Sequence, residues 1–277
     1  MIDFYSLGAA QEVTGSKHIM EVDGRSYMID CGAFQGRRAE ADAKNRNFQI
    51  SPDKLESVVV THGHYDHCGL LPLLAKNGYQ GNIYATPATR DLANLIMSDS
   101  ARIQARDAEY LSKQARRAGR KFNWKPLYNT MDVIAATNQM IGVSYHRPLY
   151  IGPQVKLEFF DAGHILGSAY AYFTVSGQKN AGPDGEIRVL YTGDLGRNNK
   201  AIIRDPATDI PAPDYIFLES TYGNRKHENL TTAMAELERI VRKAVARKGK
   251  IIIPAFAIER TQEIVYYLHL LTDKKKI

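Results

Sequence analysis

The sequence predicts an α+β fold, and three observations lead to this prediction. Short runs of β-branched and aromatic residues recur between residues 3 and 218, which is typical of strands. The segment from Pro87 to about Arg117 carries apolar side chains at helical spacing. After Leu230 a helix, a strand and a further helix are expected to follow one another, as in a parallel α/β unit.

The bulk composition is that of a folded protein. The 277 residues suffice for one large domain or two ordinary ones, and a hydrophobic content of 44% supports a core. The net charge of +6 is a mild bias toward polyanions such as nucleic acid. Cys31 and Cys68 lack the C-x-x-C spacing, so neither a disulfide framework nor a zinc ribbon is supported.

No feature of the sequence indicates a membrane or an export signal. The N-terminus lacks a basic region followed by an apolar core, and the apolar stretch around residues 251–258 is too short to span a bilayer. The expected setting is therefore cytoplasmic, without a membrane partner.

The first third of the chain alternates between strands and short polar segments. Strands are expected at 3–7 and 18–29, and Asp23-Gly24 is a hairpin turn signal within the second of these ranges. A basic segment through Arg37, Arg38, Lys44 and Arg46 is expected to be a surface loop or a short helix. Further elements are expected as a strand at 56–60, a helix beginning near 69–74 and a strand at 82–85.

The long helix after Thr86 begins with proline at its first position and is expected to stop at Gly119. Its second half is rich in cations, and two interpretations are open: a solvated helix face, or a basic rim for a polyanion. The first is favoured, because charge runs usually only solvate a face. The cations are Arg102, Arg106, Lys113, Arg116, Arg117, Arg120 and Lys121.

Strands return after a second helix expected over 129–140. They are expected at 155–160, 169–175, 187–191 and 215–218. Helical spacing from Leu230 to Ala244, with Gly249 as a stop, predicts a helix. An apolar strand is expected at 250–253 and a helix at 259–271.

The stretch Thr61-His62-Gly63-His64-Tyr65-Asp66-His67 holds three histidines and a carboxylate directly after a predicted buried strand. Imidazole and carboxylate are side chains that bind first-row dications at neutral pH. In an extended segment His62 and His64 point the same way, whereas Asp66 and His67 lie where the chain turns into a helix. This spacing predicts a metal site rather than a solvated polar loop.

Other candidate ligands also follow predicted strands. Strand ends in one sheet layer can lie along a common edge, so these side chains are expected to converge. His62, His64 and His164 would bind one metal, while Asp66 and His67 would begin a second site. Asp194 is the candidate bridge, and Asp30 is expected to orient a ligand histidine. The strand-end residues are Asp30, His62, His164, Asp194 and Glu219.

These motifs resemble those of a known family. The run from Thr61 to Gly69 is similar to the signature of the metallo-β-lactamase fold, and Asp30, His164 and Asp194 match its other motifs in order. The segments 8–16, 217–223 and 253–263 resemble the β-CASP branch, which includes the mRNA 3′-end cleavage endonuclease and bacterial and archaeal RNases. The resemblance covers essentially the whole chain.

The resemblance implies a four-layer αββα metallo-β-lactamase sandwich in residues 1–224 and a partial, inserted α/β β-CASP cap in residues 225–277. It implies one zinc on His62, His64 and His164, a second on Asp66 and His67, and Asp194 between them. Mn²⁺ or iron also suits such ligands.

The implied function is hydrolysis of RNA phosphodiesters by a dinuclear zinc-activated hydroxide. Asp66, Asp30 and Glu219 are the expected catalytic residues: Asp66 would hold the attacking water, Asp30 would orient a ligand, and Glu219 would help position a proton-donating histidine. His227 is expected either to contact substrate or to be solvated.

The chain departs from the family pattern at its end. In the family, the cap continues further and supplies two more histidines. The chain of a family member then returns from the cap to complete the lactamase domain. The present sequence is therefore expected to be truncated within the cap, without closing elements, with one ligand of the second zinc missing and with weak or no activity.

Two other classes of function stay open: a small-molecule hydrolase acting on a thioester or lactam, and a non-catalytic subunit that binds RNA. RNA is the expected partner, and a homodimer or membership of a processing complex are both compatible with the sequence.

Overall fold

The computed structural model describes residues 1–178, 185–226 and 230–277. His227 and part of the turn-rich segment 180–185 lie outside the described residues. The chain divides into two compact units. Unit 1 comprises residues 1–198 and 204–219, and unit 2 comprises residues 199–203 and 220–277. The domain boundary at 224 stays a prediction, and each unit is described by itself.

The first sheet of unit 1 contains six strands in the order in which they follow in the chain. Neighbours pair antiparallel from β1 to β3 and parallel from β3 to β6. The β2–β3 hairpin turns at Asp23 and Gly24, whose φ angles of 48° and 82° are those that its sequence favours. The strands are β1 (Ile2–Gly8), β2 (Lys17–Val22), β3 (Arg25–Ile29), β4 (Leu55–Val59), β5 (Asn82–Ala85) and β6 (Met140–Gly142).

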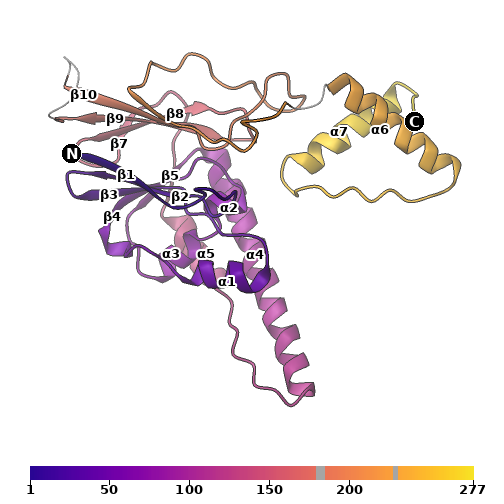
Figure 1. Cartoon of the computed structure of the whole chain (residues 1–277), viewed down its shortest axis with the longest axis horizontal. Helices are drawn as coiled ribbons and strands as arrows, with labels where there is room; N and C mark the ends of the chain where they lie inside the picture. The colour runs from indigo at the N-terminus through magenta and orange to yellow at the C-terminus, as the bar shows by residue number, and fades with distance from the viewer. Residues whose placement is uncertain (179–184, 227–229) are drawn as a thin grey trace. The chain divides into compact units, whose positions relative to one another are not determined.

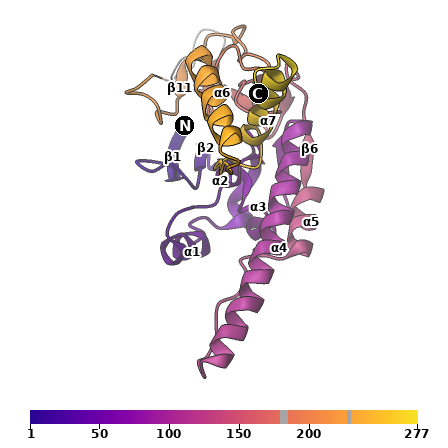
Figure 2. The same ribbon diagram turned by 90° about the vertical axis from the view of Figure 1, so that its right-hand side faces the viewer.

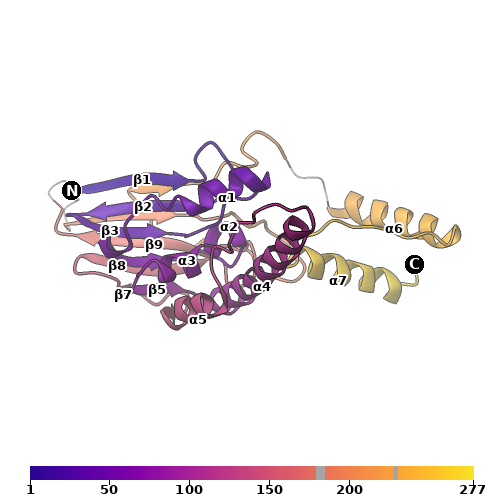
Figure 3. The same cartoon turned by 90° about the horizontal axis from the view of Figure 1, so that it is seen from below.

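The second sheet has five strands in the order β11-β10-β9-β8-β7. All its pairs are antiparallel except β10 with β11. The two sheets stack face to face in unit 1 (Figures 1 and 3). The strands are β7 (Leu149–Tyr150), β8 (Val155–Asp161), β9 (Ala169–Ser176), β10 (Glu186–Tyr191) and β11 (Tyr215–Phe217).

The core lies on both faces of the first sheet, because neighbouring residues of each strand point to opposite sides. Met20 and Val59 pack against the second sheet, in one cluster with Phe159 and Phe173. Their neighbours Ile19 and Val58 point the other way, toward the helices. This two-sided burial explains why the central strands are apolar runs rather than alternating ones.

Helices cover the outer face of the first sheet (Figure 3). The long helix starts at Pro87, and its capping residue Thr86 accepts a hydrogen bond from the Thr89 N–H. The expected helix near 69–74 forms as two short helices. The elements on this side are α1 (Arg38–Arg46), the 3₁₀ turn η1 (Pro52–Lys54), α2 (Tyr65–Cys68), α3 (Leu71–Lys76), α4 (Pro87–Arg117) and α5 (Thr130–Asn138).

The outer face of the second sheet carries a small cluster around Phe160 and Tyr172, against which Ala207 and Ile210 pack. Both Ala207 and Ile210 belong to the segment between β10 and β11, which contains no helix or strand. The α+β class and the two stacked sheets are confirmed. Among the described residues no helix is long and apolar enough to cross a membrane.

Unit 2 contains α6 (Leu230–Ala246) and α7 (Arg260–Asp273). The strand expected at 250–253 is wrong, since these residues pair with no strand, and Ile252 is 92% exposed. The described residues of unit 2 include no strand, so residues 250–253 have no partner strand with which to pair.

Candidate metal centre

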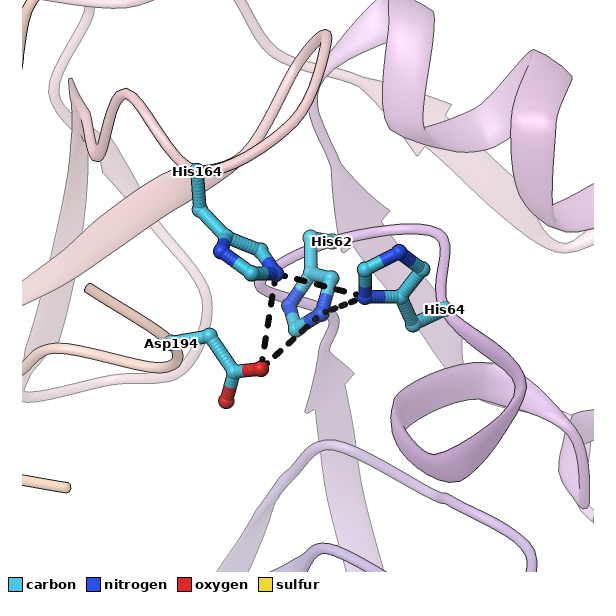
Figure 4. Close-up of side chains that lie close together, drawn as sticks. All are labelled: His62, His64, His164 and Asp194. Carbon is cyan, nitrogen blue, oxygen red and sulfur yellow. Dashed lines mark hydrogen bonds and ion pairs between the residues drawn. The ribbon is translucent and has the colours of Figure 1, made fainter. Parts of the chain in front are cut away.

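Four side chains from three separate segments meet at one end of the stacked sheets (Figure 4). His62 and His64 lie between β4 and α2, and His64 is the residue that precedes the first turn of α2. His164 lies in the loop from β8 to β9, and Asp194 follows β10. The Ala169 N–H donates to the Thr61 carbonyl at 2.8 Å, which ties the second sheet to the His62 loop.

The ligand atoms of these four residues all lie within 4.8 Å of one another. His64 Nδ1 is 3.0 Å from His62 Nε2 and 3.3 Å from His164 Nε2. Asp194 Oδ2 is 3.4 Å from His164 Nε2 and 3.8 Å from His62 Nε2. Three imidazole nitrogens and one carboxylate oxygen converging in this way fit a first-row dication.

The two oxygens of Asp194 face two different groups. Oδ2 faces His62 and His164, whereas Oδ1 lies 3.2 Å from His67 Nε2. His67 is buried in α2 and is not a member of the four-residue group. One carboxylate therefore stands between the imidazoles of the four-residue group and the imidazole of His67, which is the arrangement that a bridging ligand requires.

Asp30 holds His67 from the other side. Asp30 Oδ2 is 2.7 Å from His67 Nδ1, and the Asp30 side chain is fully buried. The carboxylate also accepts hydrogen bonds from the Thr61 N–H at 2.8 Å, from Thr61 Oγ1 at 3.0 Å and from Ser16 Oγ at 3.1 Å. A carboxylate bonded to the second nitrogen of an imidazole fixes its orientation and its tautomer.

Burial and charge set different protonation states in this cluster. Burial, followed by the nearby His67, holds the pKa of His62 well below its ordinary value. Burial acts in the same direction on His67, but the charges of Asp30 and Asp194 outweigh it and raise the His67 pKa. Burial would raise the pKa of Asp194, yet His67 and the other histidines bring it well below its usual range. The resulting ionised Asp194 and neutral His62 are the forms that bind metal, whereas His67 would have to release a proton to bind one.

All three expected catalytic residues lie outside the four-residue group: Asp30, described above, and Asp66 and Glu219. Asp66 is half-buried in the first turn of α2. Glu219 lies just beyond β11, and its Oε1 accepts a hydrogen bond from the Leu195 N–H at 3.2 Å. Glu219 therefore anchors the backbone beside Asp194. The catalytic roles of Asp66 and Glu219 stay predictions.

The sequence pattern alone did not point to three supporting residues. Thr61 and Ser16 donate to Asp30, and Gly193 packs against Thr61. A Cβ on Gly193 would lie 2.8 Å from Thr61 Oγ1, and its φ of +53° is one that favours glycine. For two of them the available signal was position: Thr61 directly precedes His62, and Gly193 directly precedes Asp194.

Comparison with known proteins places this site in context. The sequence model of the metallo-beta-lactamase superfamily matches residues 18–255. The chain is 35% identical to Ribonuclease TTHA0252 of Thermus thermophilus over 264 residues, and the aligned region covers 95% of this chain and 53% of that protein. It is 33% identical over 267 residues to Transcription termination factor FttA of Methanosarcina mazei, covering 95% of this chain and 38% of that protein.

A eukaryotic relative is also similar along nearly the whole chain. Cleavage and polyadenylation specificity factor 73 of Drosophila melanogaster is 29% identical over 271 residues, which cover 97% of this chain and 36% of that protein. The chain thus spans about half the length of the Thermus relative, and less than two fifths of the other two.

Proposed function

The chain belongs to the metallo-beta-lactamase superfamily, and from that premise we propose that it is a metal-dependent hydrolase that cleaves phosphodiester bonds of RNA. The convergence of His62, His64, His164 and Asp194 carries this proposal. The substrate class is supported by similarity over 95% of the chain to a protein named as a ribonuclease. Similarity to a cleavage and polyadenylation specificity factor supports the same class.

Zinc is the proposed metal, and the geometry of Asp194 favours two ions. His62, His64 and His164 would hold one ion, and His67, with Asp66, would contribute to the second. Mn²⁺ and iron suit the same donor atoms. When bound, such ions supply an activated water for attack on phosphorus and positive charge for the phosphoryl oxygens.

The chain's own residues prepare the site for this chemistry. The neutral His62 offers its lone pair, and the ionised Asp194 supplies negative charge between the clustered histidines and His67. Asp30 accepts at His67 Nδ1, so that His67 Nε2 is left to face Asp194. Asp66 is proposed to hold a proton of the attacking water, which is the role expected from its position in the motif.

The decisive experiment compares metal content and substrate range in one preparation. The protein should bind Zn²⁺ or Mn²⁺ and, once loaded, cleave a labelled RNA but neither a chromogenic lactam nor a thioester. His64→Asn should lose metal and any cleavage. His146→Asn is the matched control, because His146 is exposed, is not one of the four clustered residues, and has a φ of +57° that asparagine tolerates.

The outcomes separate the candidate functions. Cleavage of the thioester or lactam in place of RNA would replace the proposal with a small-molecule hydrolase. RNA binding by a protein that takes up no metal would replace it with a non-catalytic subunit. Equal loss of metal in His64→Asn and His146→Asn would contradict the assigned ligands.

A further inference from the structure

The C-terminal half of α4 leaves the core of unit 1. The buried residues of this helix form a stripe at four-residue spacing, namely Thr89, Ala93, Met97 and Ala101, and the stripe ends there. Residues 102–117 continue the helix for about 24 Å at 1.5 Å per residue. Figures 1 and 2 show this part of α4 extending beyond the sheets, with the chain returning beside it. We call residues 102–125 the basic arm.

The basic arm accounts for the entire net charge of the chain. It carries eight Lys or Arg residues against two carboxylates, an excess equal to the net charge of +6 of all 277 residues. The remainder of the chain is therefore balanced. All eight cations of the arm are exposed. A field of one sign confined to one projecting element attracts a polyanion to that element.

The cations of the helical part share one face. At about 100° per residue, five of them fall within a sector of roughly 100°. The opposite face is half-buried at Gln104, Ala108, Leu111 and Ala115, and Gln104 Oε1 accepts the Leu127 N–H at 2.8 Å. One face thus supports the return of the chain, and the other presents charge. The five cations are Arg102, Arg106, Lys113, Arg116 and Arg117.

The charges of this face are poorly compensated by the residues that the structure describes. Glu109 pairs with Lys113, while Asp107 pairs with Arg38 of α1 at 3.5 Å. Arg102 and Arg106 stand four residues apart, as do Lys113 and Arg117, and like charges at this spacing destabilise a helix. The favourable field of the helix C-terminus reaches only the last turn. A merely solvated face would be expected to alternate its charges.

The arm is fixed where the chain returns to the domain. Trp124 Nε1 donates to Asp42 Oδ1 at 2.8 Å, and the Arg38 and Arg46 guanidinium groups lie 5.1 and 5.9 Å from the centre of the indole ring. These contacts join the returning segment to α1. The basic face is therefore held in place and can meet a ligand without first being ordered.

We propose that the basic arm binds the phosphodiester backbone of RNA at a surface separate from the metal centre, and so holds the substrate that the centre cleaves. The proposal rests on the proposed function for its choice of RNA. Backbone contacts by arginine carry affinity without sequence preference. The arm should therefore affect substrate affinity and its salt dependence, and leave the chemical step unchanged.

The test measures binding of a labelled single-stranded RNA by fluorescence anisotropy in excess chelator, so that cleavage cannot interfere. The arm variant is Arg102→Gln/Arg106→Gln/Arg117→Gln, since glutamine preserves helix propensity. The control is Lys243→Gln/Arg247→Gln/Lys250→Gln, which removes three exposed charges from unit 2 and gives the same net charge. Both are titrated between about 50 and about 200 mM salt.

The arm variant should weaken RNA binding on the order of tenfold or more and lower the slope of log affinity against log salt by about 2. The control should change both values much less. Equal effects in the two variants would overturn the proposal, because they would reflect net charge alone. The proposal would also fail if the arm variant lost binding to anionic lipid vesicles but kept its affinity for RNA.

A second readout separates this proposal from the proposed function. Hydrolysis of bis(4-nitrophenyl) phosphate needs the metal centre but no extended backbone, so the arm variant should keep it. If the arm variant hydrolysed the diester normally and kept its RNA affinity, the proposal for the arm would be contradicted while the proposed function would stand. Absence of diester hydrolysis in the unaltered, metal-loaded protein would count against the proposed function, while RNA binding would still decide the role of the arm.

Discussion

Asp30 Oδ2 lies 2.7 Å from His67 Nδ1, and both side chains are buried. The carboxylate is in turn surrounded by donors, because Thr61 and Ser16 both direct hydrogen bonds to it. Asp30 has a φ of +59°, which is uncommon for a residue other than glycine and is held by this network. The contact sets the direction in which His67 presents its other nitrogen to Asp194.

Replacing Asp30 by asparagine should therefore weaken metal binding without removing a proposed ligand. An amide would place its NH₂ group against Thr61, Ser16 or His67, all of which need an acceptor there. We expect a loss of about 10–100-fold in metal affinity, measured by chelator competition. Asp42→Asn is the control, because Asp42 is also a hydrogen-bonded carboxylate but contacts Arg46 and Trp124 instead. Equal affinity in the two variants would contradict this role of Asp30.

Gly193 should not tolerate a side chain. Gly193→Ala would force a Cβ to within 2.8 Å of Thr61 Oγ1 at a φ of +53°. Gly24→Ala is the matched control, because Gly24 has a φ of +82° but no atom within 4 Å of its Cβ position. The control should cost about 1–2 kcal/mol of unfolding free energy from backbone strain alone. Gly193→Ala should cost a further 1–3 kcal/mol, roughly, through overpacking, as measured by urea denaturation.

A comparison of these two variants also reports on the metal centre. Displacing Thr61 would disturb the donors to Asp30, so Gly193→Ala should bind metal more weakly than Gly24→Ala. Equal unfolding free energies and equal metal affinities would show that the packing of Gly193 against Thr61 is unimportant.

Two substitutions of Glu219 can separate an anchoring role from a catalytic one. Glu219→Gln keeps an oxygen that accepts from the Leu195 N–H, so metal affinity should stay unchanged. Glu219→Ala removes this acceptor beside Asp194 and should lower metal affinity about fivefold to tenfold, as expected for a lost hydrogen bond of about 1 kcal/mol. Isothermal titration with Zn²⁺ measures both. Loss of affinity in Glu219→Gln would contradict the anchoring role, whereas loss of RNA cleavage at unchanged affinity would favour the catalytic one.

Much of the fold could be predicted because its signals are local. Pro87 and the apolar spacing after it indicated where α4 begins, and apolar runs such as Val58–Val59 indicated strands buried on two sides. The strand expected at 250–253 failed for the opposite reason, since strand formation depends on a partner strand that no local pattern contains. The strands β6 and β7 were missed because three and two residues are too few to show a period.

The proximity of His62, His164 and Asp194 could be expected from their places after strands that end on one side of the sheets. The supporting contacts could not. The donors to Asp30 depend on its left-handed backbone, and the Glu219 contact depends on how β11 lies beside β10. Both are consequences of tertiary packing and not of sequence spacing.

Lys17 is a buried cation whose charge depends on pH. Its Nζ donates to the Gly32 carbonyl at 2.8 Å and to the Gly15 carbonyl at 3.2 Å, and it lies 4.1 Å from the centre of the Phe34 ring. Burial lowers the pKa of Lys17 from 10.5 to about 8. The folded protein thus carries a cost of about 3 kcal/mol for the buried ammonium below pH 8.

This cost should be relieved as the pH rises. Between pH 8 and pH 10.5 the folded state loses the Lys17 proton while the unfolded state retains it, so the stability contributed by this group increases with pH. The unfolding free energy of Lys17→Met minus that of the unaltered protein should therefore fall by about 2 kcal/mol between pH 7.5 and pH 9.5. Urea denaturation at several pH values measures it, and the subtraction cancels the titration of other groups. Lys54→Met, at an exposed position, should give a difference that is constant with pH. A constant difference for Lys17→Met as well would show that the buried ammonium keeps its proton throughout this range.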